Sequence, residues 1–189
     1  MKKTMMTLAA VLCCALAFTA CQKDNTPSGD TPSGDEPDTK IAKVVVEYGF
    51  QTTDAMLQFF DFNLEYLDVT NGSKLSEKIS SANFKKEYVD VKLPLEMGYK
   101  LTTTLKAGKT IEDVKAVETM DYILPSPTAW ISMYNKDGKL IGDGGHRVIS
   151  TILPMSGEKI AQRFEEKHFD KSYLQTVDAD GNGTNGEWK

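Results

Sequence analysis

The chain has 189 residues, of which 22 are Lys or Arg and 27 are Asp or Glu, giving a formal net charge of −5 at pH 7. Phosphate neutralisation supplies most nucleic-acid affinity, so an acidic chain without a basic cluster is not expected to bind nucleic acid. The three cysteines are Cys13, Cys14 and Cys21. From residue 22 onward the sequence therefore excludes disulfides, thiolate metal sites and cysteine nucleophiles.

The first 20 residues are expected to be a signal peptide that is removed from the mature protein. Lys2 and Lys3 precede an apolar stretch over residues 5–20. This stretch is shorter and richer in small residues than a spanning helix, which needs about 20 strongly apolar residues. Without residues 1–20, the chain keeps 20 basic and 27 acidic side chains, a formal charge of −7.

The stretch ends in Phe18-Thr19-Ala20-Cys21, which resembles the lipobox of bacterial lipoproteins, with Phe18 where the family usually has Leu. The resemblance implies that the Cys21 thiol carries diacylglycerol, that cleavage precedes it, and that the new amine is acylated. The alternative is an ordinary signal peptide cut at an Ala-x-Ala-like site. Because the mature chain is acidic, we expect its membrane attachment to come from acyl chains and not from anionic lipid head groups.

The next residues, Gln22-Lys23-Asp24-Asn25, resemble the surface-export signal of Bacteroidota lipoproteins, in which Lys and acidic residues follow the lipidated Cys. Asn25 occupies one of the acidic positions. The resemblance implies an outer-membrane lipoprotein that faces the outside of the cell; a periplasm-facing lipoprotein is the alternative.

Residues 21–40 are expected to be the lipidated Cys and a disordered tether. The segment contains Thr26-Pro27-Ser28-Gly29-Asp30 and repeats it over residues 31–35, with no apolar side chain to bury. A flexible segment of this length spans roughly 20–25 Å.

Alternating apolar residues predict strands over 43–50 and 57–69, followed by a turn at Asn71-Gly72. Within 57–69 the apolar parity changes near Phe59-Phe60 and near Tyr66-Leu67, which indicates β-bulges or strand breaks. Apolar residues occupy the odd positions from Val89 to Leu105. This pattern predicts two strands, or one long edge strand, with a break near Pro94–Gly98.

The second half alternates between strand and helix signals. Residues 110–120 are ambiguous, although Thr110 and Asp113 resemble a capping box. Strands over 130–134 and 139–141 flank Asn135-Lys136-Asp137-Gly138, a hairpin turn. Further predictions are a strand over 147–153, a helix from Ser156 to about His168, a strand over 173–177 and a loose polar tail over 178–189.

Many short strands with turns between them and one short C-terminal helix predict an all-β fold. We expect an antiparallel two-sheet sandwich in a single domain over residues 41–177. Immunoglobulin-like topology is the default interpretation.

Two histidine-containing pairs are candidate chemical sites. Asp143 and His146 in a Gly-rich run would act as base and orienter or as metal ligands; the alternative is a flexible connector. Glu165 and His168 have the spacing of metal ligands on one helix face, against a solvent-exposed charged face as the alternative. Gly-x-Ser-x-Gly and His-Glu-x-x-His motifs are missing from the sequence, so we expect the protein not to be an enzyme.

Asp178, Asp180 and Asn182, followed by Gly183, match the first half of a calcium-binding loop. Position twelve of that loop is Lys189 instead of a bidentate Glu, and Glu187 would serve only in another geometry. The alternatives are weak Ca²⁺ binding and an exposed polar tail with no bound cofactor.

Trp130, Tyr134, Tyr122 and Trp188 are candidates for a sugar-stacking platform. Trp130 and Tyr134 share a parity and so a strand face; core packing of Trp130 is the alternative. Surface lipoproteins of the group that the N-terminus resembles often capture polysaccharides, which implies a binding or adhesion module for a glycan or a surface protein. The alternatives are an assembly subunit that pairs an edge strand over 87–105 with a partner, and a carboxylate-dependent hydrolase.

Overall fold

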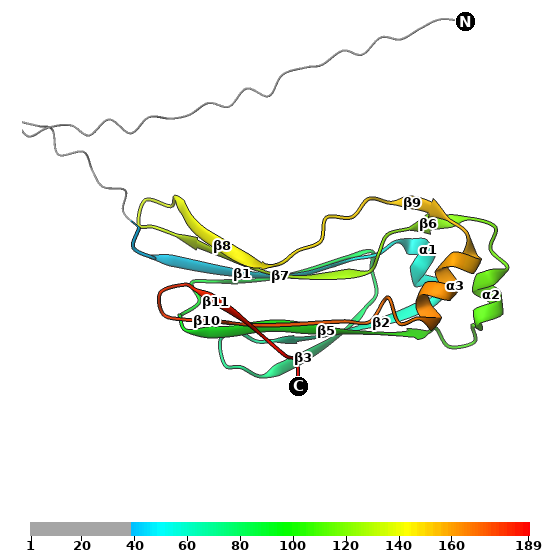
Figure 1. The fold of residues 1–189 in the computed structure, drawn as a ribbon, viewed down its shortest axis with the longest axis horizontal. Coiled ribbons are helices and arrows are strands. Elements are labelled where there is room, and N and C mark those ends of the chain that lie inside the picture. The colour runs from blue at the N-terminus through cyan, green and yellow to red at the C-terminus, as the bar shows by residue number, and fades with distance from the viewer. Residues whose placement is uncertain (1–38) are drawn as a thin grey trace, which may run out of the picture. The chain divides into compact units, whose positions relative to one another are not determined.

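The computed structural model describes residues 39–189. The strands of its two main sheets are β1 (Lys43–Gln51), β2 (Phe60–Leu67), β3 (Lys74–Ile79), β4 (Asn83–Val89), β5 (Leu95–Leu105), β7 (Ser126–Tyr134), β8 (Leu140–His146), β10 (Lys171–Val177) and β11 (Gly183–Gly186). A four-stranded sheet has the order β4-β1-β7-β8, and a five-stranded sheet has the order β11-β10-β5-β2-β3. The two sheets lie face to face (Figure 1), which confirms the predicted antiparallel sandwich.

The strand order departs from the immunoglobulin default. β1 and β2 lie in different sheets, whereas the first two strands of an immunoglobulin domain share one. The chain changes sheets through α1 (Asp54–Leu57), which Thr53 caps by accepting a hydrogen bond from the Met56 amide at 3.1 Å.

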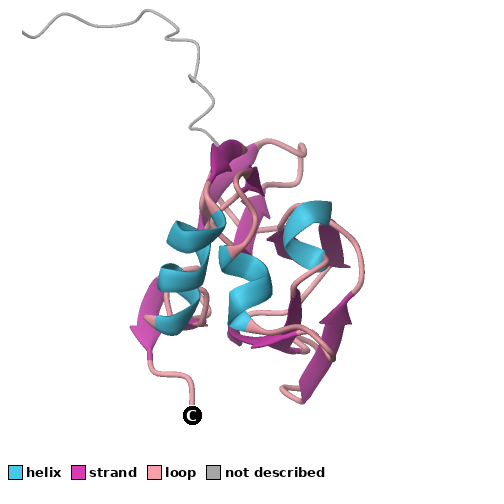
Figure 2. Cartoon of the chain, turned by 90° about the vertical axis from the view of Figure 1, so that its right-hand side faces the viewer, coloured by secondary structure: helices cyan, strands magenta, loops and turns pink. Residues whose placement is uncertain are grey.

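Three short helices close one end of the sandwich (Figure 2). They are α1, α2 (Ile111–Lys115) and α3 (Gly157–Glu165), and a small third sheet beside them pairs β6 (Met120–Tyr122) with β9 (Leu153–Met155). The opposite end, where β1 begins, consists of turns. Within residues 39–189, no helix is long and apolar enough to cross a membrane.

The core lies between the sheets because alternate residues of each strand point inward. β1 contributes Val44, Val46, Tyr48 and Phe50, and β2 contributes Phe60, Phe62, Leu64 and Tyr66. Rings from opposite sheets meet there: Phe50 and Phe62 have centroids 5.2 Å apart, and Tyr48 and Tyr66 have centroids 5.0 Å apart. Such contacts between aromatic rings add to the free energy gained from burial.

The predicted strand over 57–69 is shortened at both ends. Leu57 ends α1, and β2 starts at Phe60, the first parity change. The second change, at Tyr66-Leu67, is the end of β2. Both changes are therefore strand breaks, and the turn expected at Asn71-Gly72 follows, with Gly72 at φ 73°.

Of residues 89–105, Val89 is the last residue of β4 and residues 95–105 form the single strand β5 of the other sheet, so the prediction of one long edge strand is wrong. β5 is central, paired with β2 on one side and β10 on the other. Pro94 precedes the first pairing residue, Leu95, and so does not interrupt the hydrogen bonds. Gly98 lies inside β5, where a Cβ atom would collide with the Tyr173 carbonyl of β10.

Two predictions near the C-terminus are also wrong. Residues 147–152 form a loop instead of a strand. They connect β8 of the four-stranded sheet to β9, which pairs with β6 in the small third sheet. The tail is not loose throughout, since β11 pairs with β10 over four residues. The capping box of Thr110 and Asp113 is confirmed at α2, and α3 ends at Glu165 instead of His168.

Candidate functional site

Trp130 lies on the outer face of the four-stranded sheet and not in the core. Along β7, Ala129, Ile131 and Met133 are buried, while Trp130 and Tyr134 are half-buried on the opposite side. The predicted shared face of Trp130 and Tyr134 is therefore confirmed, and core packing of Trp130 is wrong. Four residues of strand separate the two rings by about 13 Å, so no single sugar ring spans them.

Trp130 belongs to a cluster of charged side chains on this face. The Arg147 guanidinium lies 4.9 Å from the centre of the Trp130 ring. Glu47, the β1 residue opposite Trp130, contacts Arg147 Nη2 at 3.4 Å and Lys85 Nζ at 2.7 Å. Hydrogen bonds to Glu47 and Glu87 raise the pKa of Lys85, so this lysine stays charged at neutral pH.

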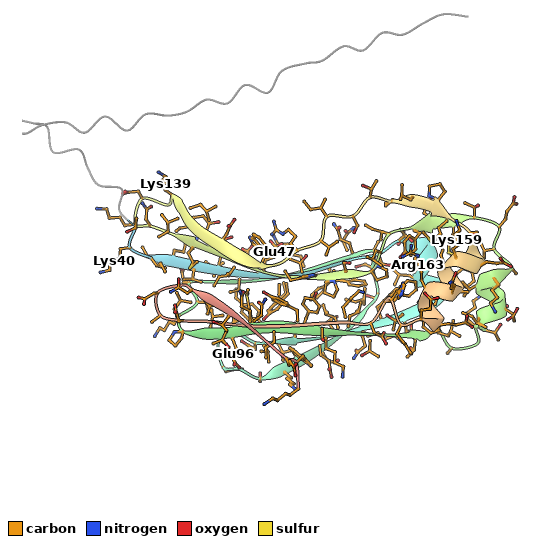
Figure 3. All side chains as sticks on the ribbon, viewed as in Figure 1. Lys40, Glu47, Glu96, Lys139, Lys159 and Arg163 are labelled. Carbon is orange, nitrogen blue, oxygen red and sulfur yellow. The ribbon has the colours of Figure 1, made fainter. Side chains whose placement is uncertain are left out.

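A groove of about 390 Å³ extends from this cluster toward the helical end of the sheet. Its floor includes Gly49, and because glycine has no side chain, nothing projects from the outer face of the sheet at this position. Ile149, 93% exposed, belongs to the loop that forms one wall. The polar lining residues come from three strands and that loop: Glu47, Gln51, Asn83, Lys85, Thr128 and Arg147. We call this depression the groove; Figure 3 shows Glu47 at the outer side of the sheet.

Sequence reasoning missed most of the groove. The alternation of β1 places Glu47 and Gln51 on the polar face, so the period alone identified them as outward residues. Lys85 and Arg147 come from β4 and from the loop after β8. Their proximity to Glu47 depends on the strand order, for which the sequence carries no local signal.

The predicted Asp143–His146 pair does not form. Asp143 lies opposite the outward Ser132, and His146 lies opposite the buried Ala129, so their side chains are on opposite faces of β8. His146 Nδ1 instead lies 2.7 Å from the Tyr99 hydroxyl and 3.4 Å from the Pro127 carbonyl oxygen. The ring also packs against Tyr173, with centroids 5.5 Å apart. His146 is thus half-buried at the edge of the sandwich, with its ring turned toward the inner tyrosines.

The Glu165–His168 pair lies on an exposed surface at and beyond the end of α3. His168 Nε2 is 3.4 Å from Glu166, two residues earlier in the sequence, and both side chains are about half exposed. Among the described residues, no three His, Cys, Asp or Glu side chains are grouped as metal ligands would be. The solvent-exposed alternative therefore describes this segment.

The residues of the predicted calcium loop form a hydrogen-bonded turn between β10 and β11. Asp178 Oδ1 accepts hydrogen bonds from the amides of Asp180 at 2.9 Å and Asn182 at 2.8 Å. The Asn182 side-chain amide also donates to Asp178. These bonds lower the pKa of Asp178. The Asp178 oxygens therefore face the donors of their own turn, and calcium binding by Asp178, Asp180 and Asn182 stays a prediction.

The two other aromatic candidates lie elsewhere. Tyr122 is buried in β6, with Arg163 over its ring at 5.8 Å. Trp188 lies beside β3 of the five-stranded sheet, 5.1 Å from Lys74 Nζ. The expected platform of four aromatics is therefore reduced to Trp130, with Tyr134 further along the same face.

Cys21 lies outside the described residues. Comparisons of the chain with protein-family models, curated proteins and solved structures find no match. The function is therefore argued from the groove.

Proposed function

We propose that the protein is a lipid-anchored cell-envelope lipoprotein whose sandwich domain binds a glycan in the groove beside Trp130. The observation that carries this proposal is the half-buried Trp130 on the solvent side of the sheet, next to convergent polar groups. Aromatic faces pack against the C–H surfaces of sugars, while a few placed polar groups fix orientation. Gln51, Asn83 and Thr128 supply such groups for hydroxyls.

The charges of the site favour an uncharged glycan. Lys85 and Arg147 both contact Glu47, and Lys85 also contacts Glu87 at 3.3 Å. Two cations thus face two carboxylates, so a charged ligand would have to break these pairs. The hydroxyl groups of a neutral sugar can form hydrogen bonds with the same side chains without changing the balance of charge among them.

Arg147 covers part of the Trp130 ring and must share it with a ligand. An exposed cation–π contact contributes about 0.5–1 kcal/mol and an exposed ion pair about 0–1 kcal/mol. Arg147 sits on a loop without regular structure. A sugar can therefore displace the guanidinium with little loss of free energy.

The same geometry argues for binding instead of hydrolysis. Glu47 and Glu87 are both ion-paired to Lys85, so neither carboxylate can act on a glycosidic bond without giving up that contact. Assembly through an edge strand is less favoured over residues 95–105, because β5 is paired on both sides; of the segment 87–105, only residues 87–89, in β4, lie at the edge of a sheet.

The test compares the two tryptophans of the chain. The full chain in detergent micelles is screened against neutral and acidic glycans, and the bound glycans are titrated by calorimetry. Trp130→Ala is expected to weaken binding at least tenfold, Trp130→Phe less, and the control Trp188→Ala not at all. Binding that survives Trp130→Ala, or a screen with no bound glycan, would reject the proposed ligand.

The anchor is tested separately by Cys21→Ser and cell fractionation. The wild-type chain is expected in the membrane fraction and the variant in the soluble fraction. Protease treatment of intact cells should degrade the wild-type chain if it faces outward. A variant that remains in the membrane fraction would refute acylation at Cys21.

A further inference from the structure

We infer that the end of the domain where β1 begins carries a second binding surface, which docks onto anionic lipid head groups. This inference rests on the proposed lipid anchor, because the tether supplies the proximity. We call the surface the basal patch and define it by Lys43, Val45, Val89, Tyr134, Lys136, Lys139 and Leu140.

The basal patch is cationic although the chain is acidic. Lys43 starts β1, and Lys136 and Lys139 belong to the hairpin between β7 and β8. Lys40 and Lys92 extend the cluster, so these segments carry five exposed lysines and two exposed acids, Asp90 and Asp137. Figure 3 shows Lys40 and Lys139 at this end of the sandwich, with Lys159 and Arg163 at the other.

Of the other acids of this end, Asp178 and Asp180 lie beside the five-stranded sheet, and Glu87 lies in β4 of the four-stranded sheet. Asp178 and Asp180 lie in the β10–β11 turn, and Asp178 is directed at its own backbone amides. The neighbouring Glu87 is bound by Lys85 at 3.3 Å. The positive charge is thus concentrated at the end of the four-stranded sheet, so that end of the domain would make the contact with the lipid.

The lysines surround apolar side chains of the kind found at membrane interfaces. Strand pairing sets Tyr134 beside Lys43 and Leu140, and Val45 beside Val89. Val89 is 48% and Leu140 47% exposed, and a depression of about 510 Å³ lies between Val45, Val89 and Tyr134. Tyrosine at the head-group level, flanked by lysines with long apolar stems, is the pattern of an interfacial contact.

The expected tether makes a weak contact sufficient. A few lysines attract an anionic membrane only modestly. A linker that reaches roughly 20–25 Å keeps the domain close to the membrane, at a local concentration on the order of millimolar. The weak attraction of the lysines then acts within one anchored molecule. The described chain enters the domain at this same end, next to Ile41 and Lys43.

Docking by this end would leave the far end of the groove clear of the head groups. Glu47 lies two residues from Val45 of the basal patch on β1, whereas Gln51 at the far end of the groove lies six residues from Val45, which corresponds to roughly 20 Å of strand.

The experiment measures lipid proximity at each end of the acylated chain. Single cysteines, Leu140→Cys in the basal patch and Thr119→Cys at the helical end, are labelled with the same dye. The chain is bound to phosphatidylcholine vesicles with or without phosphatidylglycerol, each containing a head-group quencher. With phosphatidylglycerol we expect at least twofold stronger quenching at position 140 than at position 119, and loss of the difference in high salt.

Charge reversal supplies the matched control. Lys43→Glu/Lys136→Glu/Lys139→Glu is expected to abolish the difference, whereas Lys106→Glu/Lys109→Glu/Lys159→Glu, with the same change in net charge, should preserve it. Equal quenching at both positions, or a difference that survives reversal of the patch lysines, overturns the inference. Vesicle flotation reports the anchor independently: a chain that floats without this difference disproves only the patch, and one that never floats disproves both.

Discussion

The outer face of the four-stranded sheet carries Trp130, Tyr134 and the ion pairs of Glu47, whereas that of the five-stranded sheet carries polar and charged side chains around a smaller depression. On the latter face, the Ser76 hydroxyl donates to Asn63 at 3.0 Å, and Lys78 contacts Asp61 at 2.9 Å. Thr102 and Thr104 line a shallower depression of about 320 Å³ beside them. Both inner faces, in contrast, are lined with large apolar and aromatic residues.

The contrast separates what folding requires from what it leaves open. Burial selects the inner faces of both sheets, so they resemble each other. Folding places no such demand on the outer faces, and hydrophilic residues suffice there. The outward Trp130, the overhanging loop with Ile149 and the paired charges around Glu47 occur together on one outer face, and this combination is best explained by contact with a ligand.

The largest expected effect lies where the two sheets meet. Phe50→Ala in the four-stranded sheet and Phe62→Ala in the five-stranded sheet should each reduce the free energy of unfolding by about 3–5 kcal/mol. The double variant should lose less than the sum, because the two rings contact each other. Urea unfolding curves measure these values. If one substitution were tolerated, the two inner faces would not form one core.

Alkaline pH should weaken both sheets together. Burial raises the pKa of Tyr48 and Tyr99, and it raises that of Tyr88 to about 12. Unfolded tyrosine ionises near pH 10. The free energy of unfolding should therefore be fully retained below about pH 10 and decrease as the pH rises toward the folded pKa values. Urea titrations at increasing pH, with tyrosinate absorbance, follow this loss.

Tyr88→Phe serves as the control for the pH series. In residues 39–189 the buried Tyr88 hydroxyl has no hydrogen-bond partner, so its removal costs little at neutral pH. The variant should show a shallower alkaline loss of stability. An unchanged pH dependence would mean that Tyr88 does not contribute.

Smaller effects are expected from the ion pairs of the outer faces. Glu47→Gln and Asp61→Asn should each change the free energy of unfolding by less than about 1 kcal/mol, because both pairs are partly exposed. Only Glu47→Gln should also alter glycan affinity. Thermal unfolding measures the change in stability, and calorimetric titration measures glycan affinity. If both variants changed the affinity equally, the proposed functional difference between the two outer faces would be wrong.

The smallest effect should be confined to one hairpin. Asp178→Ala removes the acceptor of the β10–β11 turn, so β11 amides should exchange hydrogen faster while those of β3, at the other edge, stay unchanged. Since hydrogen bonds lower the pKa of Asp178, acid should loosen the hairpin as the pH falls through that pKa. Calcium should leave the Tm of the wild-type chain unchanged; a calcium-dependent rise would restore the sequence-based hypothesis.

Period-two alternation was sufficient to predict the sandwich, β1, β5, β7 and β10, and the capping box was sufficient for α2. The alternation failed where the presence of a neighbouring strand decides whether a segment forms a strand. Residues 147–152 alternate acceptably but have no strand beside them, and Gly183–Gly186 is polar but pairs with β10. For the same reason the shared face of Trp130 and Tyr134 was predictable from one strand, whereas Lys85 and Arg147 were not. The pairing of distant segments is set by the whole core, not by local periodicity.

The position of β1 also determines how the domain bears mechanical load. β1 is the first strand after the expected tether, and it is held between β4 over seven residue pairs and β7 over nine. A pull on the N-terminal side runs along the strand, so the hydrogen bonds on both flanks are sheared together instead of being opened one by one. A ligand bound in the groove would contact the same four-stranded sheet. Tension between the cell and the ligand would then act on β1, which is hydrogen-bonded on both sides, and not on the five-stranded sheet.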